Sequence, residues 1–166
     1  MAEQDQRYFE DVKIGDTIPR REHGPLSVVD TVRWAGFQEN WIARLHYDRD
    51  QVRELGRFRS FIASGSYREA LIARMITDWV GAEGRLRTFN IRQTAPTIEG
   101  DLMRFSGTVV EKSPAAGDPW LTCEIEGTNQ DGEQIVRGQC TVVLPSTAGG
   151  QKKRPATRST RRAAKA

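Results

Sequence analysis

The clearest periodic pattern in the chain runs from residue 64 to residue 80. Its apolar positions recur at intervals of three and four residues over about five helical turns, and no proline interrupts them. These positions are Ala70, Leu71, Met75, Ile76, Trp79 and Val80. Because this spacing puts them on one side of an α-helix, the pattern predicts one long helix with a buried face.

Beyond Gly84 the pattern changes to runs rich in β-branched and aromatic residues, which favour strands. Four such runs cover residues 86–94, 102–111, 120–128 and 134–144. Pro, Gly, Asn and Asp, the residues of turns, separate them. A short strand is also expected between the turn at 14–16 and Gly24. This order predicts an α+β fold in which an antiparallel sheet wraps around one long central helix.

Two shorter helices are expected before the long one. Ser27 is a good capping residue for a helix that ends near Phe37, and a second helical segment follows Asp48 and ends at Gly56. Between them, residues 39–48 fit neither a helical nor a strand period, so an ordered loop is expected there. His23 precedes Gly24 and Pro25 and is expected in a turn.

Composition gives the expected domain organisation. With 166 residues, 37% of them hydrophobic, the chain can form one domain with a real core, which we assign to residues 1–146. Residues 147–166 hold seven basic and no acidic residues, leaving 18 basic against 22 acidic residues, a formal charge of −4, in the rest. This tail has no apolar period and is expected to be disordered, and composition favours a solubilising extension over contact with nucleic acid.

Nothing in the sequence indicates a membrane span or a secretion signal, so a cytoplasmic protein is expected. Cys123 and Cys140 both lie in expected strands, and neither belongs to a CxxC pair. This argues against a zinc site and for two reduced thiols in the core.

The irregular stretch at residues 39–48 contains the first candidate functional residues. It gathers Glu39, Asn40, Trp41, His46 and Asp48 within ten residues. Residues 62–67 follow and place small residues immediately before the long helix, where the first backbone N–H groups have no partner in their own helix. Together the two pieces are expected to form half of an active site.

Several short motifs resemble the MaoC-like dehydratases, the family of (R)-specific enoyl-thioester hydratases with the hot-dog fold. They are Tyr8 to Val12 with Ile14-Gly15-Asp16, the stretch His46-Tyr47-Asp48, Ser64-Gly65 at the start of the long helix, and Pro96 with Gly100-Asp101-Leu102. Their order and spacing cover residues 7–144. The combination of these motifs carries the resemblance.

The resemblance implies reversible addition of water to the 2,3-double bond of an acyl thioester carried by coenzyme A or an acyl carrier. In the family, a loop aspartate five residues before the histidine shares a water with it, and a backbone N–H at the helix start binds the thioester carbonyl. His46 matches this histidine, and Ser64 and Gly65 match the helix start. Such chemistry needs no metal or redox cofactor, and helix-start N–H groups would stabilise charge on the carbonyl oxygen.

The sequence departs from the family at the aspartate. Trp41 stands five residues before His46, and tryptophan does not shuttle protons. In a loop one residue longer, Asn40 would hold the water, and Glu39 or Asp48 are alternative sources of a carboxylate. Asp48 and Ser64 are equally explained as helix caps. Trp34, Trp41 and Trp79 are candidates for the core or for walls of the acyl pocket.

Three functions remain open on these residues. The first is a hydratase or dehydratase in which His46 is the general acid and base, Asn40 or Glu39 orients water, and Gly65 donates to the carbonyl. The second is a non-catalytic, thioester-binding subunit that pairs with a catalytic MaoC-like chain. A thioesterase with Glu69 as its carboxylate is the third and weakest. Because one such unit leaves a sheet edge open, we expect a homodimer or a heteromer with a second chain.

Overall fold

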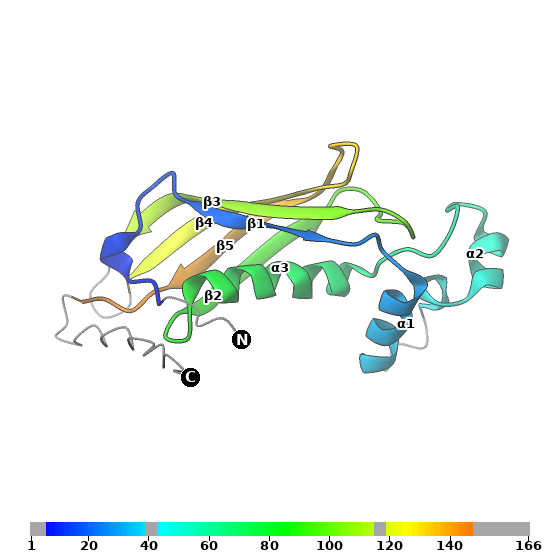
Figure 1. Ribbon diagram of the computed structural model, residues 1–166, viewed down its shortest axis with the longest axis horizontal. Helices are drawn as coiled ribbons and strands as arrows, with labels where there is room; N and C mark the ends of the chain where they lie inside the picture. The colour runs from blue at the N-terminus through cyan, green and yellow to red at the C-terminus, as the bar shows by residue number, and fades with distance from the viewer. Residues whose placement is uncertain (1–5, 39–42, 115–118, 148–166) are drawn as a thin grey trace, which may run out of the picture.

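A five-stranded antiparallel sheet curls around one long helix in the computed structural model, which describes residues 6–38, 43–114 and 119–147 (Figure 1). The strands are β1 (Thr17–His23), β2 (Arg85–Gln93), β3 (Met103–Ser113), β4 (Trp120–Thr128) and β5 (Gln134–Val143). The helices are η1 (Phe9–Asp11), α1 (Val28–Phe37), η2 (Arg44–His46), α2 (Arg49–Leu55) and α3 (Gly65–Val80). The predicted α+β architecture is confirmed.

Helix α3 begins and ends where its sequence requires. Ser64 caps its first turn by accepting a hydrogen bond from the backbone N–H of Tyr67, at 3.1 Å. Gly81, with a φ of 83°, ends it in a conformation that other residues avoid. The buried face is Arg68, Ile72, Met75, Ile76, Trp79 and Val80, so Ile72 replaces the predicted Ala70 and Leu71. The helix itself agrees with the predicted range to within one residue.

The strands pair in the order β1-β3-β4-β5-β2. β3, β4 and β5 are consecutive in the sequence and adjacent in the sheet, whereas β2 pairs with β5 and β1 pairs with β3. Long-range pairings of this kind depend on tertiary packing, so the sequence pattern gave the strands but not their order. His23 is the last residue of β1, opposite Met103, and the prediction that it lies in a turn is wrong.

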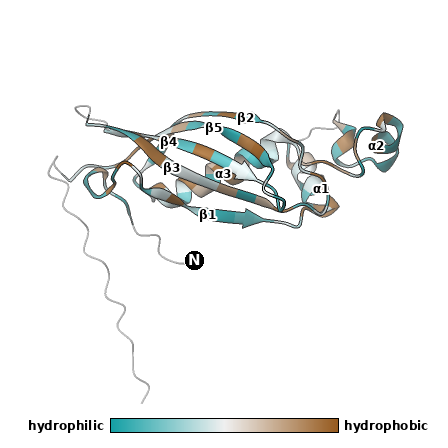
Figure 2. Cartoon of the chain, turned by 90° about the horizontal axis from the view of Figure 1, so that it is seen from above, coloured by the Kyte–Doolittle hydropathy of each residue, from teal (hydrophilic) through white to brown (hydrophobic). Residues whose placement is uncertain are grey.

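The core fills the space between α3 and the concave face of the sheet. Its members include Phe105, Val109, Leu121 and Ile135, all fully buried. Cys123 and Cys140 are also buried, as predicted, and face each other on β4 and β5. In Figure 2 the apolar stretches of the strands lie over α3. No helix in the described part of the chain is long and apolar enough to cross a lipid bilayer.

Helices α1 and α2 project beyond the N-terminal end of α3, away from the sheet (Figure 1). α1 starts with a capping box, in which Ser27 and Asp30 each bond the backbone N–H of the other. α2 ends at Gly56, whose φ of 60° is left-handed. Residues 148–166 of the tail predicted at 147–166 lie outside the described residues, so its predicted disorder stays a prediction.

Candidate functional site

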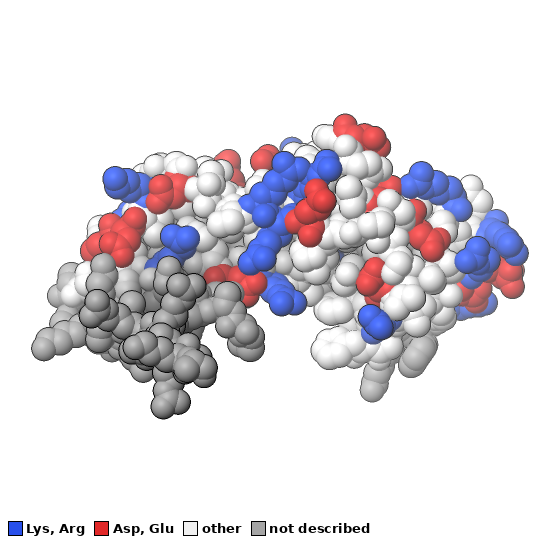
Figure 3. Space-filling view, viewed as in Figure 1, with Lys and Arg blue, Asp and Glu red and all other residues white. Residues whose placement is uncertain are grey.

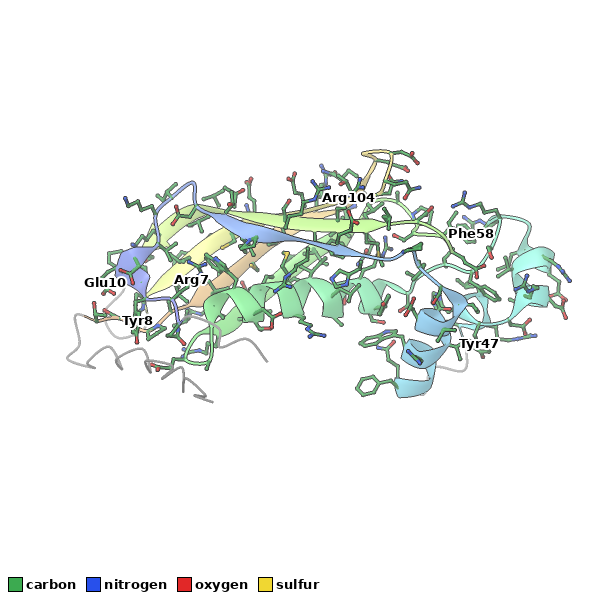
Figure 4. The ribbon with its side chains drawn as sticks, viewed as in Figure 1. Arg7, Tyr8, Glu10, Tyr47, Phe58 and Arg104 are labelled. Atoms are coloured by element: carbon green, nitrogen blue, oxygen red, sulfur yellow. The ribbon has the colours of Figure 1, made fainter. Side chains whose placement is uncertain are left out.

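His46 is held in a single helical turn, η2, between the two projecting helices. Its backbone N–H donates to the carbonyl of Ala43 at 3.2 Å, and the next residue, Tyr47, closes the turn onto Arg44. Figure 4 shows Tyr47 in this projecting part of the molecule. The predicted loop is therefore, over residues 43–48, a short ordered turn. Glu39, Asn40 and Trp41 lie outside the described residues.

The Asp48 carboxylate accepts hydrogen bonds from residues close to it in the sequence. It accepts from the backbone N–H groups of Asp50 and Gln51 at the start of α2 and from the Arg44 guanidinium at 2.9 Å. The bond from Arg44 is the main cause of a lowered pKa for the Asp48 carboxyl. These contacts support capping and argue against Asp48 as a proton-transfer group.

The His46 ring is fixed by a backbone carbonyl. Its Nδ1 lies 2.8 Å from the carbonyl oxygen of Ile62. Because a carbonyl oxygen only accepts hydrogen bonds, Nδ1 is the donor, and Nε2 carries the lone pair of the neutral ring. The ring is thereby oriented with one nitrogen available as a base.

The carbonyl that orients His46 belongs to a well-supported segment. Residues 61–63 pair with residues 97–99, including a bond from the Ala63 N–H to the Thr97 carbonyl at 2.9 Å. Arg68 of α3 is buried and donates to the Ala95 carbonyl at 2.6 Å. Its burial lowers the pKa of the guanidinium to about 10. This side chain ties the start of α3 to the segment on which the Ile62 carbonyl depends.

The first turn of α3 presents backbone donors next to its cap, Ser64. Ser64 acts as the helix cap, which is one of the two roles predicted for it. Its hydroxyl oxygen accepts a hydrogen bond from the backbone N–H of Tyr67. The backbone N–H groups of Gly65 and Ser66 lie in the first turn, where no carbonyl of the same helix can accept from them. With the helix dipole they favour negative charge at this point.

His46 and Ser64 line one small cavity. Its other walls are Thr31, Trp34, Ala35, Gln38 and Tyr67, and its volume is about 10 Å³. This is room for roughly one water molecule and for no acyl group. The structure thus brings together the predicted histidine and the predicted helix start around a water-sized space.

Two aromatic rings separate this cavity from an open groove. The groove, of about 320 Å³, is lined by Asp30, Arg33, Trp34, Phe37 and Tyr67. Trp34 and Tyr67 belong to both spaces, with ring centroids 5.6 Å apart. The indole Nε1 of Trp34 donates to the Ser66 hydroxyl at 3.0 Å, which fixes its orientation. Trp34 and Tyr67 therefore stand at the boundary between the groove and the cavity.

Other predicted residues lie elsewhere. Trp79 is buried in the core under the sheet. Glu69 is exposed on α3, outside the residues lining the cavity, and its carboxylate accepts a hydrogen bond from Gln93 Nε2 at 3.5 Å. Gln38 was missed as a site residue, because its hydrogen bond from Ser66 joins segments 28 residues apart and leaves no periodic signal. Ile62 and Tyr67 lie in the stretch expected to form half of the site, but their contacts with His46 and Trp34 leave no such signal either.

A curated relative is similar over part of the chain. It is the 3-oxo-4,17-pregnadiene-20-carboxyl-CoA hydratase beta subunit of Mycobacterium tuberculosis, 28% identical over 91 residues. The match spans 55% of this chain and 67% of the relative. No protein-family model matches the sequence.

Solved structures cover more of the chain. The R-hydratase PhaJ1 from Pseudomonas aeruginosa matches with a TM-score of 0.74 and 22% identity, over 84% of this chain and 86% of its own. The ChsH1-ChsH2 complex from Mycobacterium tuberculosis matches at 0.68 and 22%, over 80% and 98%. The MaoC-like dehydratase from Rhodospirillum rubrum matches at 0.66 and 22%, over 84% and 97%.

This chain has the hot-dog fold of the MaoC-like dehydratases and R-hydratases. The resemblance drawn from short motifs is therefore confirmed at the level of the fold. In this MaoC-like fold, the projecting helices α1 and α2 bring His46 to the leading end of α3. The position of the family aspartate, Trp41 by spacing, falls outside the described residues.

Proposed function

We propose that this chain is a hydratase or dehydratase that adds water to, or removes it from, the 2,3-bond of an acyl thioester. The observation that carries the proposal is the placement of His46. Its ring lines the cavity next to the α3 N-terminus, and the bond from its Nδ1 to the Ile62 carbonyl leaves Nε2 as the proton acceptor. Coenzyme A or an acyl carrier would bear the substrate.

The reaction assigns one role to each group. In hydration, Nε2 of His46 takes a proton from water, the hydroxide oxygen bonds to the β-carbon, and the α-carbon receives a proton from the imidazolium. Charge that develops on the thioester oxygen would be stabilised by the N–H groups of Gly65 and Ser66. Asn40 or Glu39 would orient the water. Dehydration runs through the same groups in reverse.

The direct test is hydration of crotonyl-CoA by the purified full chain, followed as loss of the enoyl absorbance. Activity in the chain alone supports the proposal. The second arm repeats the assay with a co-encoded MaoC-like chain, if its own genome provides one. No activity in either arm contradicts the assignment of a hydratase.

A second candidate, a thioester-binding subunit of a heteromeric dehydratase, is favoured by one specific observation. The cavity at His46 holds about 10 Å³, because Trp34 and Tyr67 fill the space that an acyl chain would need. The curated relative is itself named a beta subunit, and one structural neighbour is a complex of two different chains. Activity that appears only when the partner is added, and that survives loss of His46, would select this candidate.

The Asp48→Asn variant separates capping from catalysis at this position. Asparagine caps helices about as well as aspartate, so we expect α2 to be retained. Only the ion pair with Arg44 is lost, and because water screens such a pair at the surface its loss should affect stability little. Hydration activity should therefore stay close to that of the wild-type chain. If Asp48 replaced the family aspartate, the same variant would lose nearly all activity in the crotonyl-CoA assay.

A further inference from the structure

The described lining of the His46 cavity contains no carboxylate that could hold a water beside the imidazole. Helix α1 supplies Thr31, Trp34 and Ala35 to this lining. In Figure 3 the surface over α1 is largely uncharged, whereas charged side chains gather over α2. On this side a water in the cavity therefore meets neutral groups. One of them is the side-chain amide of Gln38, which directly follows α1 and lines the cavity.

A chain of hydrogen bonds determines which way the Gln38 amide faces. The indole Nε1 of Trp34 can only donate, so the hydroxyl oxygen of Ser66 accepts from it at 3.0 Å. The Ser66 hydroxyl donates its single hydrogen to Oε1 of Gln38, at 2.8 Å. The Oγ of Ser64 lies 3.1 Å from the Oγ of Ser66, so Ser64 is the donor between these two hydroxyls. Each hydroxyl hydrogen then has one acceptor, and the amide oxygen of Gln38 is turned toward Ser66.

This orientation leaves the amide nitrogen of Gln38, with its two hydrogens, as a donor. The His46 ring has the opposite polarity, because Nδ1 donates to the Ile62 carbonyl and Nε2 is left as an acceptor. Both side chains line the same space of about 10 Å³, which is room for roughly one water molecule. A water in that space can donate a hydrogen to the imidazole and accept one from the amide. Its second lone pair then remains for a bond to carbon.

We propose that Gln38 is a positioning residue for the water of the reaction, and that its Nε2 donates to the oxygen whose proton His46 exchanges. The role rests on the function proposed above and adds to the one given there to Asn40 or Glu39. In hydration the water gives a proton to His46, its oxygen bonds to the β-carbon, and the imidazolium returns a proton to the α-carbon. Gln38 keeps both of its hydrogens throughout. In dehydration the same amide stabilises the hydroxyl group as it leaves.

Two variants at Gln38 separate the donor from the rest of the side chain. Gln38→Glu has nearly the same shape and still accepts from Ser66, but at pH 7 its ionised carboxylate has no hydrogen to donate. Gln38→Ala removes the donor and the acceptor together. We expect kcat to fall at least about tenfold in both variants and KM to stay within about twofold of the wild type, because the water and not the thioester is misplaced. Initial rates with crotonyl-CoA over a range of concentrations measure the two constants.

The Ser66→Ala variant tests the contact that orients the amide. It removes the acceptor of the Trp34 indole and the donor to Gln38 Oε1. We expect a smaller fall in kcat than in Gln38→Ala. The double variant Gln38→Ala/Ser66→Ala should match Gln38→Ala alone, because residues that act through one contact are not additive. Losses that add in the double variant would overturn the orientation proposed for the amide.

Gln134→Glu is the matched control, since it makes the same change at an exposed glutamine at the start of β5, outside the cavity. It should keep the kcat of the wild type. Gln38 is also exposed, so its variants should unfold at nearly the wild-type temperature, which a thermal unfolding curve for each variant measures.

The assays use the full chain, alone or with its MaoC-like partner chain, in whichever preparation hydrates crotonyl-CoA. If the wild type is active and Gln38→Glu keeps its kcat, or if the loss is confined to KM, the role of Gln38 is overturned and the hydratase assignment stands. If neither preparation is active, the hydratase assignment and the role of Gln38 both fall.

Discussion

In the His46→Ala variant the hydration rate is expected to fall by a factor of about 10² to 10⁴, because this one side chain both takes a proton from water and returns one to carbon. The fold should survive. His46 is half-buried, and the substitution removes one hydrogen bond, to the Ile62 carbonyl, whose loss costs about 1 kcal/mol. Initial rates with crotonyl-CoA, together with a thermal unfolding curve for each variant, measure the two effects separately.

The chain offers a matched control, since His23 is its only other histidine. His23 is at the end of β1, with its ring centroid 6.1 Å from that of Phe105, and it does not line the cavity. Burial and the charges of Arg21 and Arg74 lower its pKa, so it is neutral at pH 7. His23→Ala should keep wild-type activity. Equal rates for His46→Ala and the wild type would remove the imidazole from the mechanism.

Local signals explain how much of the fold could be predicted. Ser64, Gly81 and the spacing between them define α3 by capping and periodicity alone, and Gly56 ends α2 for the same reason. The pairing of β2 with β5 depends on contacts between residues about 50 apart, which no local pattern encodes. The order of one early strand, one long helix and four further strands already indicated a sheet wrapped around a helix, and the motifs that resemble a known family sharpened this to the hot-dog architecture.

Some parts of the candidate site could be predicted from local sequence signals, and others could not. His46 and the start of α3 were identifiable because an irregular polar stretch and a run of small residues stand out from the periodic segments around them. The bond between His46 and the Ile62 carbonyl and the contact between the Trp34 and Tyr67 rings were not, because a bond across 16 residues and a ring contact across 33 arise only from folding. The role of His46 itself stays a prediction until its variant is assayed.

Phe105→Ala should be the most destabilising simple truncation in the sheet. The ring is fully buried on β3, and it packs so closely on Gly127 of β4 that a Cβ there would lie 2.7 Å from its Cδ1. Strands packed this tightly do not collapse into the cavity left by the ring, so the free energy of unfolding should fall by about 3–5 kcal/mol. This is a large share of the total free energy of unfolding of a typical protein, about 5–15 kcal/mol.

Phe37→Ala is the matched control for Phe105→Ala, because it removes the same side chain from an exposed position. Phe37 is 79% exposed at the end of α1, so Phe37→Ala should alter the free energy of unfolding by less than about 0.5 kcal/mol. Urea unfolding followed by circular dichroism compares the two variants. Because Phe37 lines the open groove beside the His46 cavity, its variant also reports on substrate entry: weaker use of long acyl thioesters with unchanged stability would place the acyl chain there. Losses of similar size at Phe105 and Phe37 would contradict the packing described for the core.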